Sequence, residues 1–391
     1  MKENKLVPTL RFIGFDDNWK ILYLKNVLQE LIDCEHKTAP YIDYSEYLVV
    51  RTNNVRAGTL IYLDMKYTTK DGFEEWTRRG RPEYGDILFT REAPAGESCL
   101  VPKQKKVCLG QRMVLLRPDN KKTNGLYLSV YLNTYSGKRS ISDLAIGTTV
   151  SRINIKDILR LKYPFPTLPE QQKIAAFLSV IVEKIQQLTR KKELLEQYKK
   201  GVMQQLFSGK LRFKDENGKD YPEWKVKSLG DILDYIQPSK YLVNSTEYDD
   251  SYAVPVLTAG KTFILGYTNE ISNIFDENLP VILFDDFTTA TQFVDFPFKA
   301  KSSAMKILVA KEDENISYIY EAMTLIRFEI GGHGRHWISQ FSHLTIPYPC
   351  YEEQKKIASY LSNIDKKIEV VTIQITKTQT FKKGLLQQMF V

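Results

Sequence analysis

The sequence predicts an α+β protein built as two related halves, each ending in a long charged helix. Three observations support this prediction. One stretch of the chain is duplicated at a constant spacing, and that stretch has the apolar period of a coiled coil. The two bodies that precede the copies have the turn and strand signals of mixed α+β domains. We therefore expect two α+β domains separated by a pair of long antiparallel coiled-coil helices.

The duplication is clearest in the helical stretch. Glu170-Gln-Gln-Lys-Ile-Ala-Ala-Phe-Leu-Ser returns as Glu353-Gln-Lys-Lys-Ile-Ala-Ser-Tyr-Leu-Ser. Lys199-Lys-Gly-Val-Met-Gln-Gln-Leu-Phe returns as Lys382-Lys-Gly-Leu-Leu-Gln-Gln-Met-Phe. Both pairs are 183 positions apart, so the register holds without a gap.

A second pair of matches opens each half. Leu10-Arg-Phe returns as Leu211-Arg-Phe, and Trp19-Lys returns as Trp224-Lys. The bodies between the opening motif and the helix show little resemblance and differ in length. Each half therefore has the same opening motif and the same helical stretch, with a body of different sequence between them.

Apolar residues in the duplicated stretch alternate at spacings of four and three, the seam of a coiled coil. A helix of this stretch would be about 55 Å long at 1.5 Å per residue, and its apolar stripe needs a partner. The alternative is a pair of ordinary core helices inside one compact domain. We predict that the seam packs through Ile174, Leu178, Ile181, Ile185, Leu188 and Leu195 in the first copy, and Ile357, Leu361, Ile364, Ile368, Val371 and Ile375 in the second.

These signals predict four segments. A first recognition domain covers 1–165 and a first helix 166–209; a second domain covers 210–348 and a second helix 349–391. Within the bodies, β-branched and aromatic runs bounded by Gly, Pro and Asp predict strands. Segments 126–135 and 315–329 have helical patterns.

Composition favours a polyanionic partner in a reducing compartment. The 391 residues include 55 Lys+Arg against 47 Asp+Glu, a net charge of +8, with 23 Tyr and 19 Phe. Four scattered cysteines argue against a disulfide frame or a zinc module. The first residues lack the apolar segment of a secretory signal, and no apolar run approaches the roughly 18 residues of a membrane span. We expect a cytoplasmic protein that does not contact membrane.

Basic and polar loops between the predicted strands are the candidate DNA contacts. Arg and Lys can read guanine edges, whereas phosphate contacts only position a domain. For any one of these residues a solvated surface charge is the alternative. The stretch Gly331–Trp337 combines small residues with several donors. The candidates are Arg78, Arg79, Arg81, Arg91, Lys103, Lys105, Lys138 and Arg139 in the first body, and Lys240, Tyr241, Lys261, Thr262, His333, Arg335 and His336 in the second.

Motifs for catalysis are absent from the sequence. The Asn-Pro-Pro-aromatic motif of amino-methyltransferases and the Gly-x-Gly-x-x-Gly motif do not occur. Gly260-Lys-Thr resembles the end of a phosphate loop, but Pro255 stands where the first glycine belongs. His333-x-x-His336 lacks further ligands at metal spacing, so we expect no metal site. A self-contained methyltransferase or nuclease with an unfamiliar site, and a coiled-coil scaffold, are the alternatives to a recognition subunit.

Four segments together resemble one family. They are Pro8-Thr-Leu-Arg-Phe with Trp19, Gly85-Asp-Ile-Leu-Phe-Thr, Pro169-Glu-Gln-Gln-Lys-Ile-Ala-Ala-Phe-Leu, and Gly209-Lys-Leu-Arg-Phe-Lys-Asp-Glu-Asn-Gly-Lys-Asp-Tyr-Pro-Glu-Trp224. They are similar to the specificity subunits of type I restriction–modification systems, and the resemblance covers essentially the whole chain.

The resemblance implies a non-catalytic subunit that reads double-stranded DNA as an asymmetric, interrupted target, one half per domain. It further implies docking of two methyltransferase (modification) subunits, which form an adenine methylase that uses S-adenosylmethionine. Restriction subunits with ATP-driven translocase activity would complete the nuclease. S-adenosylmethionine, ATP and Mg²⁺ would be bound by those partners and not by this chain. The recognition domains of the family vary too much to carry base-contact residues across.

Overall fold

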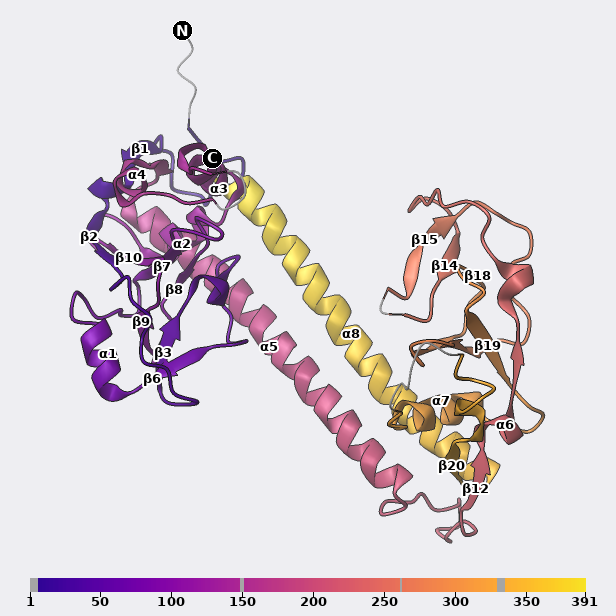
Figure 1. Cartoon of the computed structure of the whole chain (residues 1–391). Helices are drawn as coiled ribbons and strands as arrows, with labels where there is room; N and C mark the ends of the chain where they lie inside the picture. The colour runs from indigo at the N-terminus through magenta and orange to yellow at the C-terminus, as the bar shows by residue number, and fades with distance from the viewer. Residues whose placement is uncertain (1–5, 148–150, 261, 329–334) are drawn as a thin grey trace. The chain divides into compact units, whose positions relative to one another are not determined.

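The computed structural model describes residues 6–147, 151–260, 262–328 and 335–391. The chain forms two compact units, the first made of Met1–Thr189 with Ile373–Val391 and the second of Arg190–Thr372. Two long helices, α5 (Leu168–Phe207) and α8 (Tyr351–Met389), are each divided between the units (Figure 1). The first unit holds the start of α5 and the end of α8, and the second holds the end of α5 and the start of α8. This partition is the one that an antiparallel pair of helices gives.

The first unit is built on a four-stranded antiparallel sheet of order β2-β10-β7-β8, with the pair β1-β11, the pair β4-β5 and the three-stranded sheet β6-β3-β9 beside it. Its strands are β1 (Lys20–Tyr23), β2 (Leu28–Asp33), β3 (Tyr47–Val50), β4 (Val55–Arg56), β5 (Thr59–Leu60), β6 (Lys66–Thr68), β7 (Ile87–Thr90), β8 (Ser98–Leu100), β9 (Lys106–Leu109), β10 (Met113–Pro118) and β11 (Lys162–Phe165). Its helices, besides α5 and α8, are α1 (Lys70–Trp76), α2 (Gly125–Leu132), α3 (Tyr135–Leu144) and α4 (Ile155–Arg160).

Strand β7 shows how the two faces of this sheet are used. Side chains alternate between the faces of a strand, so Ile87 and Phe89 point one way and Leu88 the other. Ile87 and Phe89 pack with α2 and the long helices, whereas Leu88 packs with β3 and β9. All three side chains are fully buried. A strand covered on both faces has a continuous apolar run, which is why Ile-Leu-Phe has no polar alternation.

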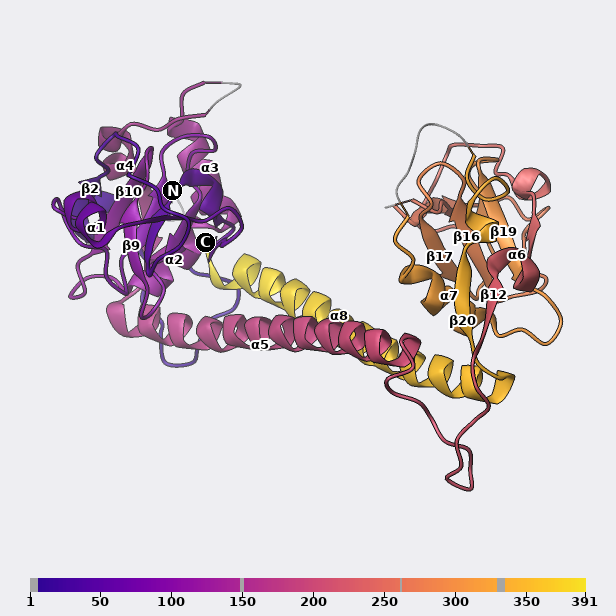
Figure 2. The ribbon, with the colours of Figure 1, turned by 60° about the horizontal axis from the view of Figure 1, so that its bottom comes forward.

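The second unit repeats this topology. Its four-stranded sheet has the order β13-β19-β16-β17, of which β16, β17 and β19 are labelled in Figure 2. It also carries the pair β12-β20 and the sheet β15-β14-β18 (Figure 1). The strands are β12 (Lys225–Ser228), β13 (Leu233–Ile236), β14 (Val254–Leu257), β15 (Ile264–Thr268), β16 (Val281–Asp285), β17 (Thr291–Val294), β18 (Lys299–Ala300), β19 (Met305–Ala310) and β20 (Thr345–Tyr348). Helices α6 (Leu229–Ile232) and α7 (Ile316–Thr324) complete it. The bodies that differ in sequence therefore share one fold.

The register of the two sheets also corresponds. Leu116 on β10 lies opposite Ile87, and Leu308 on β19 lies opposite Ile282. Ile282-Leu-Phe thus takes the place of Ile87-Leu-Phe, with the same residue types on the same faces. This short identity was present in the sequence and was not recognised there as part of the repeat.

The helices predicted over 126–135 and 315–329 are present as α2 and α7. Each begins after an asparagine whose side chain accepts a hydrogen bond from the third backbone N–H that follows, Tyr127 after Asn124 and Tyr318 after Asn315. The two tyrosine hydroxyls donate to carbonyls of the strand that leads into the long helix. The predicted α+β class is confirmed.

The duplicated opening motif and the duplicated Glu-Gln meet in space. Arg11 donates through Nε and Nη2 to the two carboxylate oxygens of Glu170 at 2.7 and 2.8 Å, and Trp19 Nε1 lies 3.4 Å from the same carboxylate. Glu170 is 1% exposed, so its charge requires this pairing. Gln171 fixes the turn before α5 by donating to the carbonyl of Pro166.

The second unit repeats the arrangement. Arg212 donates to Glu353 at 3.2 and 2.8 Å, Trp224 Nε1 donates at 2.8 Å, and Gln354 donates to the carbonyl of Pro349. The repeated residues of the sequence are therefore the residues that lock the start of each long helix to the opening motif of its own unit.

The predicted seam of the long helices is their covered face. The twelve residues predicted to pack are all buried or half-buried. Ile174, Leu178 and Ile181 join the core of the first unit, and Ile357, Leu361 and Ile364 join that of the second. None of the helices described is both long and apolar enough to cross a membrane.

Candidate nucleic-acid interface

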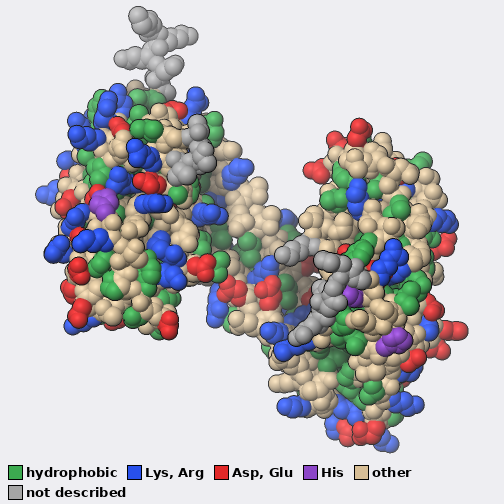
Figure 3. Space-filling model, viewed as in Figure 1, with side chains coloured by type: hydrophobic (Ala, Val, Ile, Leu, Met, Phe, Trp, Pro, Cys, Tyr) green, Lys and Arg blue, Asp and Glu red, His purple; other side chains and the backbone are tan. Residues whose placement is uncertain are grey.

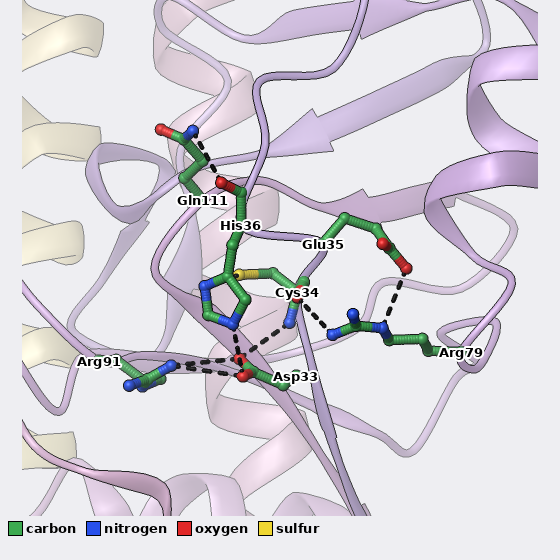
Figure 4. Close-up of polar contacts among 7 residues, drawn as sticks. All are labelled: Asp33, Cys34, Glu35, His36, Arg79, Arg91 and Gln111. Atoms are coloured by element: carbon green, nitrogen blue, oxygen red, sulfur yellow. Dashed lines mark hydrogen bonds and ion pairs between the residues drawn. The ribbon is translucent and has the colours of Figure 1, made fainter.

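A tight turn after β2 brings together two of the predicted DNA-contact residues of the first unit, Arg79 and Arg91 (Figure 4). The ladder between β2 and β10 ends at Asp33, opposite Val114, and the chain then turns through Cys34, Glu35 and His36. His36 has a φ of 57°, a conformation that few side chains adopt, and its carbonyl accepts a hydrogen bond from Gln111. The turn thus projects acidic side chains from a fixed strand end.

Asp33 holds Arg91. Arg91 Nη1 lies 3.3 Å from Asp33 Oδ1, and His36 Nε2 contacts Asp33 Oδ2 at 2.8 Å. The backbone of Arg91 is fixed as well, since its N–H donates to Arg112 and its carbonyl accepts from Ile153. The Arg91 side chain is 18% exposed, so it is a positioned guanidinium and not a freely moving surface charge.

Glu35 holds Arg79 from the same turn. Arg79 Nε forms an ion pair with Glu35 Oε1 at 3.1 Å, and Nη1 donates to the carbonyl of Cys34 at 2.9 Å. Arg78 lies farther from the Glu35 carboxylate, at 3.9 Å, and its side chain is 73% exposed. Arg79 is therefore oriented, whereas Arg78 remains largely in solvent.

The remaining first-unit candidates make their contacts with residues outside this turn. Arg81 pairs with Glu74 and covers the ring of Phe73, and Lys138 pairs with Glu97 at 2.6 Å. The Lys103 ammonium lies 5.0 Å from the ring centre of Tyr84. Lys105 and Arg139 are exposed.

Two second-unit candidates occupy the turn that corresponds to 33–36. Lys240 is exposed, with its ammonium 5.6 Å from the ring centre of Tyr241, and Tyr241 packs edge-on against Phe275. This 3₁₀ turn, Pro238–Tyr241, follows β13 as the turn 33–36 follows β2. Thr262 and Arg335 are also exposed. Lys261 and His333 lie outside the described residues.

His336 requires a correction. It was expected to donate from a contact loop, but it is 2% exposed and its ring packs against Phe328. Its backbone N–H donates to the carbonyl of Asp286, and the next N–H, of Trp337, donates to the Asp286 carboxylate. His336 is therefore a core residue, because an aromatic cluster around Phe341 covers this end of the sheet.

Asp286 marks the largest difference between the units. Its backbone N–H donates to Ala304 as that of Arg91 donates to Arg112, so Asp286 occupies the position of Arg91. Its carboxylate lies 3.7 Å from Lys306 Nζ, and both side chains are 2% exposed. The first unit therefore has a partly exposed cation at the place where the second has a buried ion pair.

A family model described as the type I restriction modification DNA specificity domain matches residues 18–197 and 221–378. The chain belongs to this family. It is a specificity subunit of a type I restriction–modification system, a DNA-recognition subunit and not a catalytic one. The two matched segments follow the duplication, and each contains one body and most of one long helix.

Two specificity subunits illustrate the range of similarity. The subunit of EcoR124I/EcoR124II from Escherichia coli is 46% identical over 163 residues, which is 40% of this chain and 40% of that protein. The MjaX subunit of Methanocaldococcus jannaschii, itself described as putative, is 25% identical over 402 aligned positions, covering 95% of this chain and 92% of that protein. The matching part therefore covers less than half of the E. coli protein's length.

Two solved structures share the fold of this specificity subunit. The S subunit from M. genitalium superposes with a TM-score of 0.71 at 18% identity, covering 98% of this chain and 99% of that one. A chain from a study of complex assembly and conformational transition in the type I system gives a TM-score of 0.51 at 14% identity and covers 96% and 98%.

Sequence reasoning missed the acidic side of this specificity subunit's candidate interface. Asp33 and Glu35 pair with Arg91 and Arg79, yet no acidic residue was among the expected contact residues. The available signal was Asp33-Cys-Glu-His, which begins at the last residue of the strand run Leu28–Asp33, because charges at a strand end lie at the rim of a sheet. The two bonded arginines come from elsewhere in the chain, so their pairing needed the fold.

The same turn offers three ligand atoms, from Asp33, Cys34 and His36, within 4.8 Å of one another. Asp33 already pairs with Arg91, whose positive charge opposes a cation, and it accepts from His36. The group is better described as an ion-pair network than as a metal centre. Burial raises the pKa of Cys99 and that of Cys108 to about 12, so neither thiol is a nucleophile at neutral pH.

Proposed function

We propose that this specificity subunit reads a DNA target in two unlike halves, one by each unit. One observation carries the proposal: the chain repeats one sheet in one register, with different charged side chains at the corresponding strand ends. A common scaffold with different reading residues is suited to two different short sequences, because specificity is read by the side chains that reach base edges.

The surface charge supports DNA as the partner. The chain has a net charge of +8, and Lys and Arg side chains crowd the face of the first unit visible in Figure 3, with Asp and Glu among them. Exposed cations such as Arg78, Lys105 and Arg139 would contact phosphates, while oriented side chains would contact bases.

The long helices would supply the docking sites for two methyltransferase subunits. Tyr198 and Phe381 hold corresponding positions in the two copies and are 52% and 57% exposed. In the first unit Phe177 packs edge-on against Phe12 with ring centres 5.7 Å apart, and in the second Tyr360 packs against Phe213 at the same distance. Exposed aromatic groups that occur twice suit one partner bound twice.

In the assembled enzyme those partners would bind S-adenosylmethionine and methylate adenine, and restriction subunits would bind ATP and Mg²⁺. The specificity subunit would supply the target sequence. Its long helices would set the number of unread bases between the two halves.

Methylome sequencing tests the proposal. The chain is expressed with its cognate methyltransferase subunit in a host that lacks other DNA methylation, and the methyltransferase alone is the control. We expect a new motif of two unlike halves that requires this chain. If the two subunits form a complex and no methylated motif appears, the proposal is wrong. It is also wrong if the motif is one continuous sequence and not two separated halves.

A further inference from the structure

In the first unit two carboxylates of the turn Asp33–His36 each pair with an arginine, and this pairing suits the arginines to one function. We propose that Arg91 and Arg79 are base-reading residues, each directed at a guanine of the half-site that the first unit reads. Asp33 and Glu35 are their positioning residues. This inference rests on the proposed function, and it names the bases that one unit recognises. Two parallel N–H donors of a guanidinium match O6 and N7 of guanine in the major groove.

The paired carboxylates favour base reading over phosphate binding. A phosphate contact needs net positive charge and little orientation, and an adjacent carboxylate cancels that charge. A base contact needs the planar fork held in one direction, which a carboxylate partner provides. Arg79 and Arg91 have such partners at 3.1 and 3.3 Å. Arg78, at 3.9 Å and 73% exposed, is suited to phosphate.

Donors of both arginines remain available. Arg79 Nη1 donates to the Cys34 carbonyl and Arg91 Nη1 donates to Asp33. Arg79 Nε lies 3.1 Å from Glu35 Oε1 as an ion pair, and that oxygen has no hydrogen-bond partner within the described residues. Within the described residues no hydrogen bond occupies Nη2 of either side chain. Arg91 Nε is buried, so a guanine edge would reach the Nη groups of this side chain and not its Nε. An incoming guanine edge would satisfy donors that the protein orients but does not use.

Rigid backbone supports Arg91 and its partner Asp33. Arg91 continues the β7–β10 ladder through its N–H to Arg112, and its carbonyl accepts from Ile153. Asp33 is the last ladder residue of β2, beside Val114 of the same β10 strand. Side chains placed on strand ends are held more accurately than those on free loops.

In the second unit the corresponding positions do not hold an arginine paired with a carboxylate. Gln237, directly after β13, corresponds to Asp33, the last residue of β2, and the following turn contains Lys240. Asp286 replaces Arg91 and is buried with Lys306. Losing the acid-held arginines should therefore change one half of the target and leave the other half unchanged.

The test compares the methylated motifs of variant complexes, each purified with the methyltransferase subunit. Arg91→Ala should relax one guanine position of one half-site, with discrimination there falling about tenfold to hundredfold. Arg79→Ala should relax a different guanine of the same half-site. Asp33→Asn and Glu35→Gln should relax the same positions as their arginines, by smaller factors. Arg91→Lys should also relax its position, because it keeps the charge and removes the fork.

Arg160→Ala is the matched control. Arg160 is 73% exposed and paired with Asp157 at 3.8 Å on α4 of the same unit, and its loss should leave the motif unchanged. Should Arg91→Ala fail to assemble, Arg91→Lys and Asp33→Asn decide the question, since both keep the size of the side chain.

Three outcomes would overturn the inference while leaving the proposed function intact. The unaltered complex could show a split motif in which neither half contains guanine. The variants could methylate the full motif with unchanged discrimination. Methylation could also fall equally at all sequences, which is the signature of a phosphate contact. Absence of any motif with the unaltered complex would instead contradict the proposed function itself.

Discussion

In the first unit Arg91 leaves the end of β7 and pairs with Asp33, whereas in the second unit Asp286 leaves the end of β16 and pairs with Lys306. The backbone hydrogen bonds at these two positions are the same, and the charges are reversed. The difference teaches that the apolar pattern of the strands determines the sheet and its register, while residues at the strand ends can change without altering the scaffold.

Residues that the two units have in common should be the most sensitive to change. Glu170→Ala and Glu353→Ala each remove a buried carboxylate and leave an arginine and a tryptophan N–H without their acceptor. Breaking a buried pair in this way costs about 3–5 kcal/mol. We expect each variant to destabilise its own unit by this amount, measured by urea denaturation with hydrogen exchange to locate the loss.

Glu352→Ala is the control for that experiment, because Glu352 lies beside Glu353 and is exposed. A change below about 1 kcal/mol, the range of an exposed ion pair, would contradict the view that the repeated glutamates hold the helix starts.

The charge reversal can be examined by making the second unit resemble the first. Lys306 on β19 corresponds to Val114 on β10, and Lys306→Val leaves the buried Asp286 carboxylate with one backbone donor, from Trp337. We expect a loss of about 3 kcal/mol in the free energy of unfolding. Adding Asp286→Asn should recover part of it, because the uncompensated charge is removed. Additive losses in this double-mutant cycle would mean that the two side chains do not interact.

The sequence predicted the parts that depend on local pattern. Helix period and seam residues from Ile174 to Ile375 followed from spacing alone, and the asparagine-capped helices α2 and α7 were located to within a few residues. The common fold of the two bodies was missed, because apart from Ile-Leu-Phe their strands share composition and not sequence. The partners of Arg79 and Arg91 were missed for another reason: each pair joins residues more than forty positions apart, and only the register of the sheet brings them together.

Substitutions of two corresponding lysines on the long helices should change the stability of the protein in opposite directions. Lys199 lies between Glu321 and Asp365 at 2.9 and 2.8 Å, and although burial alone would lower its pKa, these hydrogen bonds raise it. Lys382, 183 positions later, is half-buried, and burial lowers its pKa. Lys199→Met should lower the free energy of unfolding by about 2 kcal/mol, because it leaves the buried Glu321 carboxylate without its cation. Lys382→Met should raise the free energy of unfolding by roughly 0.5–1 kcal/mol.

The pH dependence gives the Lys382 prediction its sign. A lysine whose pKa is lower in the folded protein binds its proton more tightly when unfolded, so it opposes folding at neutral pH. That opposition declines as pH rises from the folded pKa toward the ordinary value of 10.5. The gain from Lys382→Met should therefore be present at pH 7 and vanish above about pH 10.5. Thermal unfolding at pH 7 and pH 10.5 measures it, and a destabilised variant at pH 7 would contradict it.

The smallest effect is expected where the two proposed docking surfaces differ by hydroxyl groups. Tyr198 and Tyr360 share a hydrogen bond of 2.6 Å, and the corresponding first-unit residues, Phe381 and Phe177, have none to share. The hydroxyl pair is solvent-accessible, so water replaces either partner, and the double variant Tyr198→Phe/Tyr360→Phe should change stability by less than about 1 kcal/mol. If both surfaces receive the same methyltransferase through their rings, the variant should still bind two copies, measured by light scattering of the purified complex. A complex with one copy would show that the hydroxyls, and not the shared aromatic rings, define the second docking site.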